Sequence, residues 1–142
     1  MSAPPPAPPL KGRGGIRFAG YAAVFGRPDT GGDVVRSGAF ERSLKMREAV
    51  PLLCQHKGQA IGRIEHLSED SRGLRVIASV ADERTAGLLR SGRLSGLSFG
   101  YRVREARHDG ARRELVELDL IEVSLVARPM QPKARVHAVE DA

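Results

Sequence analysis

A long, almost uninterrupted apolar segment near the C-terminal end most constrains the fold of this chain. It reads RELVELDLIEVSLV over residues 113–126, and its side chains alternate with the two-residue period of a β-strand. The segment before it, LSFGYRVREAR at 97–107, has the same character, and HDG between the two supplies a turn. The sequence therefore predicts a β-hairpin with a long second strand.

Shorter segments extend this pattern along the rest of the chain. Strand character is found at 16–25, 50–56, 60–67, 74–81 and 134–139, and helical spacing at 37–49 (Ser37 as N-cap) and 82–92 (Asp82 as N-cap, Gly92 as stop). We therefore expect an α+β fold of mostly antiparallel strands, a small β-barrel of about seven strands with helices packed outside it.

Length and composition fit one globular domain with an aliphatic core. The chain has 142 residues, of which 41% are hydrophobic but only 4% aromatic. Its one cysteine, Cys54, allows no internal disulfide and favours a reducing, intracellular setting. No apolar run approaches the roughly 20 residues of a membrane helix. We expect a disordered proline-rich arm at 1–15, a folded domain at 16–138 and a short tail at 139–142.

The net charge of +6 favours an acidic partner or a nucleic acid. Much of the excess lies in YRVREARHDGARREL, residues 101–115. No aromatic residues interleave with these arginines and no nucleic-acid-binding module is visible, so a solvated hairpin is favoured over nucleic-acid binding.

Residues 96–100 contain the pattern G-x-S-x-G with Ser98 at its centre. In α/β-hydrolases this pattern follows a strand and opens a helix, whereas here the helix comes before and the strand after. The order Ser98, Asp119, His137 would suit that class, but the chain is too short for a doubly wound sheet and lacks βαβ units. The pattern therefore does not indicate an α/β-hydrolase.

Alternation places Ser98 on an accessible face of its strand. Ser98 and Gly100 share one face, while Leu97 and Phe99 share the other and are expected to pack inward. Gly100 would leave room for a substrate backbone. Ser95 is the alternative serine, but it points to the other face and ranks second.

A nucleophilic serine needs a base, and His56 is the best candidate among the four histidines. It closes an apolar strand and precedes the flexible segment KGQAIG, whereas His66 and His108 lie in or beside polar turns and His137 lies near the C-terminus. The alternative is a partly buried histidine bonded to the backbone.

Glu122 is an ionisable group among aliphatic residues of the long strand. By alternation it lies on one face with Leu120 and Ser124, whereas Asp119 faces the opposite side and solvent. A buried carboxylate needs a partner, and a histidine oriented by it would be a suitable one. The alternative is an edge position from which Glu122 reaches water.

Other chemistry fits the sequence less well. Cys54 and His56 share a strand face but lie about 6.6 Å apart along the chain, which is loose for a Cys–His dyad. No cluster of His, Cys or Asp has the spacing of metal ligands. We expect no metal and no cofactor.

As a set, these residues resemble the prohead (capsid-maturation) protease family of tailed bacteriophages and of phage-derived particles, including prophage and gene-transfer-particle versions. The resemblance covers roughly residues 18–136. It is carried by GYAAVFGRPDTGGDVVRSGAF, VPLLCQHKGQAIGRIEHLSEDSRGLRV, LLRSGRLSGLSFGYRV and LIEVSLVARPMQPKARV, in the order of the family.

The resemblance implies a serine endopeptidase related in fold to the herpesvirus assembly proteases. The family's histidine in the QH block falls on His56, its serine in LSFGY on Ser98 and its acidic residue in EVSLV on Glu122. Asp119 competes for the third role, and relatives with this fold can use a second histidine. The viral relatives suggest backbone N–H groups near Arg128 as oxyanion donors.

The implied substrates are the scaffold and the scaffolding segment of the major capsid protein, and also the enzyme itself. The implied setting is the interior of an immature capsid in the cytoplasm of a bacterial host, without a membrane and with a homodimer as one oligomeric option. The alternative is a non-catalytic capsid-assembly or scaffold-binding protein on the same fold.

Overall fold

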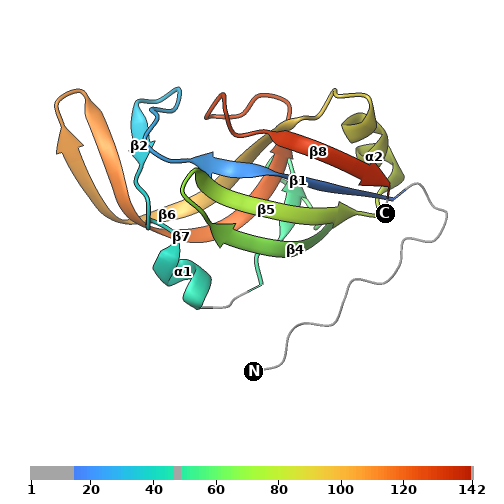
Figure 1. Ribbon diagram of the computed structural model, residues 1–142, viewed down its shortest axis with the longest axis horizontal. Coiled ribbons are helices and arrows are strands. Elements are labelled where there is room, and N and C mark those ends of the chain that lie inside the picture. The colour runs from blue at the N-terminus through green and yellow to red at the C-terminus, as the bar shows by residue number, and fades with distance from the viewer. Residues whose placement is uncertain (1–14, 47–48, 142) are drawn as a thin grey trace.

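The computed structural model describes residues 15–46 and 49–141, and these form a β-rich fold with two short helices (Figure 1). The predicted N-terminal arm lies, apart from Gly15, outside the described residues. The elements are β1 (Ile16–Val24), β2 (Asp33–Val35), α1 (Glu41–Lys45), β3 (Leu52–Cys54), β4 (Gly62–Glu69), β5 (Gly73–Val80), α2 (Glu83–Arg90), β6 (Gly96–Asp109), β7 (Arg112–Val126) and β8 (Val136–Asp141).

One sheet has the strand order β4-β5-β1-β8, and all its pairs are antiparallel. Its inner face carries apolar side chains at alternate positions, such as Ile16 and Phe18 of β1 and Val76 and Ala78 of β5, all of which are buried. Strand β8 continues through residues 139–141, which we had expected to form a tail, because they pair with the first residues of β1.

The second sheet is built on the predicted hairpin. Strands β6 and β7 pair antiparallel over almost their whole length, from Gly96 opposite Val126 to Asp109 opposite Arg112. Since β6 fills one edge of β7, the short strands β2 and β3 share the other edge, and both run parallel to β7. The mostly antiparallel β fold is confirmed, with these two parallel pairs as an addition.

Residues 134–136 join the two sheets. Tyr21 N of β1 donates to Arg135 O at 3.2 Å, Leu97 N of β6 donates to Ala134 O at 2.9 Å, and Val136 N donates to Ser95 O at 2.9 Å. This segment therefore bonds β1 on one side and the start of β6 on the other, which holds the strand carrying Ser98 against the first sheet.

The core between the sheets is aliphatic, as the composition predicts. Its two phenylalanines are Phe18 and Phe40, and the Phe40 ring meets the Phe99 ring edge-on at 5.2 Å. Most other core positions are Val, Leu, Ile or Ala. Each fully buried Leu or Val contributes about 1.5–3 kcal/mol by leaving water, so no disulfide is needed to hold the fold.

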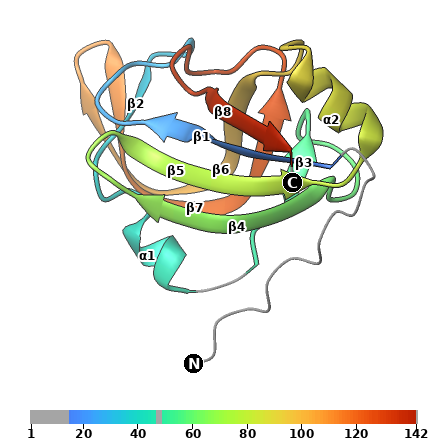
Figure 2. The same ribbon diagram turned by 45° about the vertical axis from the view of Figure 1, so that its right-hand side comes forward.

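The helices lie at opposite ends of the molecule (Figures 1 and 2). Helix α2 begins as predicted, because Asp82 Oδ2 accepts a hydrogen bond from Thr85 N at 2.9 Å. The predicted cap Ser37 is wrong. Residues before α1 form a turn in which the Glu69 carboxylate accepts from Gly38 N and Phe40 N, so the helix starts later and is shorter than expected.

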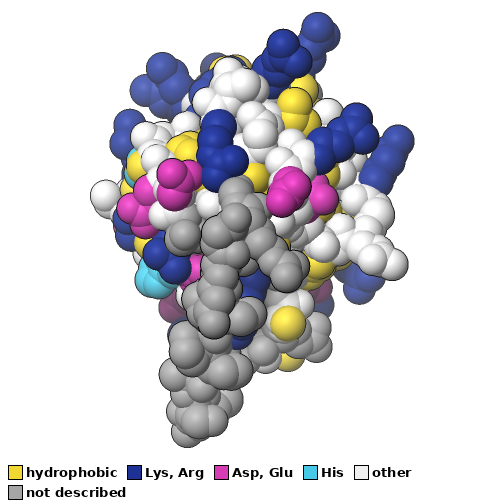
Figure 3. All heavy atoms as spheres, turned by 90° about the vertical axis from the view of Figure 1, so that its right-hand side faces the viewer, with side chains coloured by type: hydrophobic (Ala, Val, Ile, Leu, Met, Phe, Trp, Pro, Cys, Tyr) yellow, Lys and Arg dark blue, Asp and Glu magenta, His cyan; other side chains and the backbone are white. Residues whose placement is uncertain are grey.

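Neither helix in the described ranges has the length and apolar character that crossing a membrane requires. On the face shown in Figure 3, lysine and arginine side chains protrude from several places, with acidic side chains between them rather than in a separate region. The basic excess is thus spread over this face.

Candidate active site

Ser98 and Glu122 lie on the same face of the β6–β7 hairpin, opposite the core. The register pairs Ser98 with Ser124 and Gly100 with Glu122. Antiparallel partners have Cα atoms about 4.5–5.5 Å apart, so these four residues form one compact patch. Glu122 is 7% exposed and Ser124 is fully buried.

A turn after β3 brings His56 over this patch. Gln55 and His56 both have positive φ values, 53° and 61°, which are unfavourable for residues other than glycine. The turn is held by hydrogen bonds from Gln55 N to Leu125 O at 2.9 Å and from Lys57 N to Cys54 O at 3.1 Å. It reverses the chain, so that the imidazole reaches back to β7.

The imidazole of His56 is hydrogen-bonded to the carboxylate of Glu122. His56 Nδ1 and Glu122 Oε2 are 2.7 Å apart. A carboxylate can only accept, so this bond assigns the ring proton to Nδ1 and leaves Nε2 with a free lone pair. The nearly buried Glu122 therefore has the histidine partner that burial demands, and it does not need water as a substitute.

Ser124 ties this pair to the strand. Its Oγ donates to Glu122 Oε1 at 2.6 Å and accepts from the backbone N–H of His56 at 3.1 Å. Both oxygens of Glu122 are thus engaged, and the left-handed residue His56 is anchored through its own backbone. Sequence reasoning missed this role, although alternation had placed Ser124 on the face of Glu122.

Gly100 makes room for the Glu122 carboxylate. A Cβ atom added at Gly100 would collide with Glu122 Oε2 and lie 3.0 Å from its Cδ. The expectation that Gly100 leaves space for a substrate backbone is therefore corrected, because Glu122 fills this space. Gly96 is needed for a similar reason, since a Cβ there would lie 2.7 Å from Pro129 Cδ.

The Ser98 hydroxyl is accessible and unbonded. The residue is only 6% exposed, and no hydrogen bond joins its Oγ to the His56 ring or to another side chain of residues 15–46 and 49–141. Since no fully buried side-chain oxygen in these ranges lacks a partner, Ser98 Oγ must reach the surface. The side chain of His56 is 42% exposed, so its ring is open to solvent on one side while Nδ1 bonds Glu122.

Other candidates lie elsewhere or have different partners. A register shift opposite Gly100 and Tyr101 reverses the alternation at Ile121, so the expectation that Glu122 shares a face with Leu120 and that Asp119 faces the other side is wrong. Asp119 nevertheless pairs with Arg42 at 3.6 Å and Arg104 at 3.2 Å rather than with His56. Ser95 is 3.5 Å from Arg135 Nη1. Burial raises the pKa of the Cys54 thiol, and Asp82 raises it further, which disfavours the nucleophilic thiolate.

The remaining histidines lie outside this patch. His66 Nε2 bonds Ser68 Oγ at 2.8 Å on the surface, His108 lies on the hairpin opposite Arg113, and the His137 ring is 5.9 Å from that of Tyr21. The described residues contain no group of three or more His, Cys, Asp or Glu side chains that could hold a metal ion.

Comparison with known sequences points to one family. The model of the caudovirus prohead serine proteases matches residues 8–142. The prohead protease of Enterobacteria phage HK97 is 33% identical over 102 residues, which are 65% of this chain and 44% of that protein. The chain therefore spans less than half the length of this relative.

Comparison with solved structures shows the fold. The capsid assembly protease of bacteriophage T4 has a TM-score of 0.65 at 16% identity, covering 81% of this chain and 84% of the other. The protease of KSHV, solved with a hexapeptide phosphonate inhibitor, scores 0.60 at 14% identity over 90% and 66% of the two chains. Varicella-zoster virus protease scores 0.60 at 13% identity over 89% and 64%. The expected herpesvirus-protease-like fold is confirmed.

Proposed function

The chain belongs to the caudovirus prohead serine protease family, and from this premise we propose that it is a serine endopeptidase of capsid maturation. We assign Ser98 as nucleophile, His56 as general base and Glu122 as the residue that orients the base. The observation that carries the proposal is the 2.7 Å bond between His56 Nδ1 and Glu122 Oε2, beside an accessible Ser98 on the neighbouring strand.

The mechanism follows from the free lone pair on His56 Nε2. When a peptide binds, Nε2 comes within about 3 Å of Ser98 Oγ and accepts its proton as the oxygen attacks the peptide carbonyl. The imidazolium then gives this proton to the leaving amine, and water hydrolyses the acyl-enzyme by the same route. Glu122 stabilises the imidazolium and, because its bond fixes Nδ1–H, keeps the ring in the basic tautomer.

The backbone N–H of Arg128 is the oxyanion donor that the structure supports best. Arg128 follows β7 directly. Ala127 N is engaged by Gln55 Oε1 at 3.3 Å and Pro129 has no N–H, whereas Arg128 N has no backbone acceptor in the described chain. Gly96, two residues before Ser98, packs against Pro129, which holds this segment beside β6. An unused N–H so placed can bind the developing negative charge.

We propose that the substrates are the scaffold, the scaffolding segment of the major capsid protein and the enzyme itself, cleaved inside the immature capsid in the host cytoplasm. The proposed partners also include a second copy of the chain, with which it would form a homodimer. The family supports these assignments, because its members are prohead proteases.

Co-expression with the cognate capsid protein and scaffold tests the proposal. Ser98→Ala and His56→Ala should abolish cleavage, and a fluorophosphonate probe should label wild-type protein at Ser98. Ser95→Ala and His66→Ala are matched controls that should cleave normally. Normal cleavage by Ser98→Ala would refute the catalytic assignment. If capsids assembled normally although the wild-type protein cleaved neither the capsid protein nor the scaffold, a non-catalytic assembly role would be favoured.

A further inference from the structure

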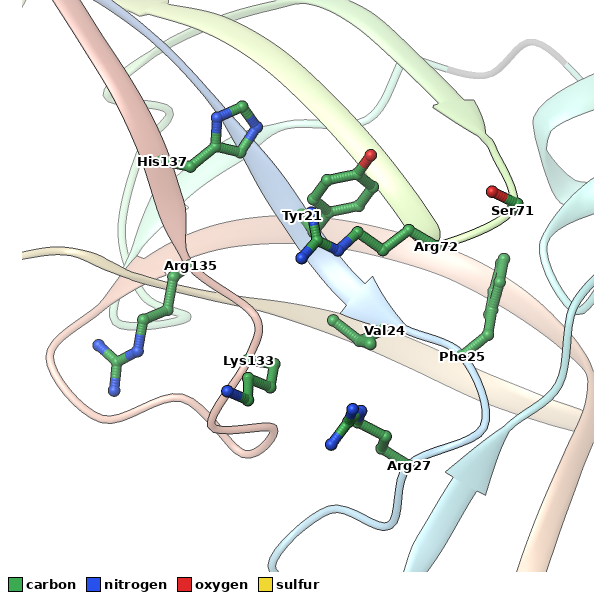
Figure 4. Close-up of a pocket in the computed structure, with 9 residues that line it drawn as sticks. All are labelled: Tyr21, Val24, Phe25, Arg27, Ser71, Arg72, Lys133, Arg135 and His137. Atoms are coloured by element: carbon green, nitrogen blue, oxygen red, sulfur yellow. The ribbon is translucent and has the colours of Figure 1, made fainter.

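A basic pocket lies outside the proposed catalytic residues, beside the C-terminal half of β1. Its volume is about 360 Å³. Figure 4 shows Arg27, Arg72 and Lys133 arranged around Val24, with Arg135 and His137 along one side. The complete lining is Tyr21, Val24, Phe25, Arg27, Ser71, Arg72, Lys133, Arg135 and His137.

Among residues 15–46 and 49–141, no carboxylate forms an ion pair with the cations of this pocket. Elsewhere arginines such as Arg17 and Arg113 form ion pairs with carboxylates, but Arg27, Arg72 and Lys133 have none among the described residues. The same holds for Arg135, whose guanidinium bonds Pro132 O at 2.9 Å and contacts Ser95 Oγ. Four positive charges around one concave site favour an anionic ligand.

Asp70, whose carboxylate bonds two residues of the pocket lining, is committed to these groups. Asp70 accepts a hydrogen bond from Tyr21 Oη at 2.5 Å and from the backbone N–H groups of Arg72 and Gly73. These bonds hold the pKa of Asp70 below its usual value, with the Tyr21 bond as the largest cause. Asp70 therefore holds Tyr21 and the backbone of Arg72 in place and is not itself part of the lining.

The walls of the pocket are tied together by buried hydrogen bonds. Gln131 bonds both backbone groups of Val24, with its Oε1 accepting from Val24 N and its Nε2 donating to Val24 O, each at 2.9 Å. Phe25 N donates to Arg72 O at 3.0 Å, and Tyr21 N to Arg135 O at 3.2 Å. The basic side chains thus start from a fixed backbone, which lowers the entropy cost of binding.

We propose that this pocket binds an acidic, extended peptide segment of a partner protein. Carboxylate side chains lie between Arg27, Arg72 and Lys133, and the aliphatic part of the segment lies on Val24 and Phe25. Guanidinium and ammonium groups form strong charge-assisted hydrogen bonds with carboxylates.

Two observations favour a peptide over a nucleic acid. A duplex needs basic side chains along an extended surface, whereas this pocket has the size of a few side chains. A single strand needs a series of open aromatic rings for its bases, but of the two aromatic residues in this lining, Tyr21 already has Arg72 at 5.4 Å and His137 at 5.9 Å, which leaves Phe25 alone. A mixed apolar and basic lining suits acidic side chains on a peptide better.

The proposal does not rest on the catalytic assignment, because none of the lining residues belongs to the proposed triad. It is tested with the full chain carrying Ser98→Ala, so that the probe is not cleaved. The probe is a fluorescein-labelled peptide of alternating Glu and Val, followed by fluorescence anisotropy. The same peptide with Gln in place of Glu, and an unlabelled single-stranded oligonucleotide as competitor, complete the set.

The decisive comparison is between two pairs of substitutions that remove the same charge. Arg27→Gln with Lys133→Gln changes two exposed pocket residues, whereas Arg102→Gln with Arg112→Gln changes two exposed residues of the β6–β7 hairpin. We expect the pocket pair to lower the affinity for the Glu peptide about tenfold or more, since two charge-assisted contacts are lost. The hairpin pair should lower this affinity by less than about twofold, because it acts through long-range charge alone.

If both pairs of substitutions weakened binding of the Glu peptide equally, the proposal would be overturned, because net charge alone would then explain the binding. Equal affinity for the Gln peptide, or no measurable binding of the Glu peptide, would overturn it as well. Tighter binding of the oligonucleotide, lost in the pocket pair, would assign the site to nucleic acid instead. Thermal unfolding of each variant shows whether the substitutions leave the fold intact.

Discussion

At the scale of single residues, the candidate site is organised by the Ser124 hydroxyl. This buried group contacts Glu122, whose other oxygen holds the His56 ring, and it also binds the backbone of His56. Ser124 is also the cross-strand neighbour of Ser98. One small hydroxyl therefore fixes the relative positions of the proposed base and its orienting acid, so it is a positioning residue.

We predict that Ser124→Ala lowers kcat about tenfold or more and leaves KM nearly unchanged. The substitution leaves a buried carboxylate oxygen without a partner, which costs about 1–3 kcal/mol, and frees Glu122 and His56 from their common anchor. Steady-state kinetics on a peptide substrate measure the effect. Ser79→Ala, at another buried serine of the first sheet, is the control and should keep kcat. A change in KM alone would contradict a positioning role.

We predict that Gly100→Ala lowers catalytic activity strongly but changes the stability of the fold little. The new methyl group collides with Glu122 Oε2, so the carboxylate has to leave the His56 ring and activity should fall about 100-fold. Gly87→Ala in helix α2 meets no atom within 4 Å and should raise stability by about 0.5–1 kcal/mol. Peptide hydrolysis and thermal unfolding of the two variants separate these effects, and full activity in Gly100→Ala would be the contrary result.

Residue patterns predicted part of this site and not the rest. Alternation placed Ser98 on one face of its strand, and put Glu122 and Ser124 on one face of theirs, because the two-residue period is a local property. The positive φ values of Gln55 and His56 and the hydrogen bonds of Ser124 were missed. They depend on how the turn after β3 meets β7, a contact between residues far apart in sequence.

At the scale of elements, sequence patterns predicted a structure correctly where that structure depends on one continuous segment of the chain. The β6–β7 hairpin and the Asp82 cap of α2 were predicted correctly. The Ser37 cap failed because Glu69, from a different strand, binds the N–H groups of that turn. The parallel pairing of β3 with β7 was not foreseen either, since short connections favour antiparallel neighbours.

The cap of α2 should make part of the stability pH-dependent. Hydrogen bonds from Thr85 lower the pKa of Asp82 below its ordinary 3.8, so the folded state binds this proton less readily than the unfolded state. Its contribution is therefore present above about pH 4 and is lost as pH falls through the lowered folded pKa. We predict that Asp82→Ala costs about 1 kcal/mol at pH 7, with a difference from wild type that shrinks in acid.

Asp82→Asn is the matched variant, because asparagine caps a helix but does not titrate in this range. Its stability at pH 7 should be close to that of wild type, and the capping contribution should persist at low pH. Urea unfolding of the three proteins between neutral and acidic pH measures this. If the free energies of unfolding of wild type and Asp82→Ala differed by the same amount at every pH, the Asp82 cap would not be the cause of the pH dependence of stability.

At the scale of the whole molecule, distant segments meet at residues 131–136. This stretch bonds the end of β1 through Gln131, the middle of β1 through Arg135 and the start of β6 through Ala134 and Val136. It therefore links the first sheet to the strand that carries Ser98. The pocket beside it brings together residues from positions 21–27, 71–72 and 133–137, which no sequence pattern connects, so net charge alone could suggest an acidic partner but not its site.

Gln131 supplies the side-chain part of this link, at the end of β1. Gln131 is 5% exposed, and its side-chain amide bonds both the N–H and the C=O of Val24. In Gln131→Ala both backbone groups lose their partners inside the fold, at about 1–3 kcal/mol each unless water enters. We predict that unfolding free energy falls by about 2–4 kcal/mol and that the Val24 amide exchanges faster with solvent.

The exposed Gln59 offers the matched control, and Gln59→Ala should change stability by less than about 0.5 kcal/mol. Urea unfolding and hydrogen exchange compare the two variants. Because residues 131–136 also position the pocket and the start of β6, Gln131→Ala should weaken acidic-peptide binding and peptide hydrolysis together, while leaving the His56–Glu122 bond in place. Loss of one activity with full retention of the other would show that the segment does not connect the two sites.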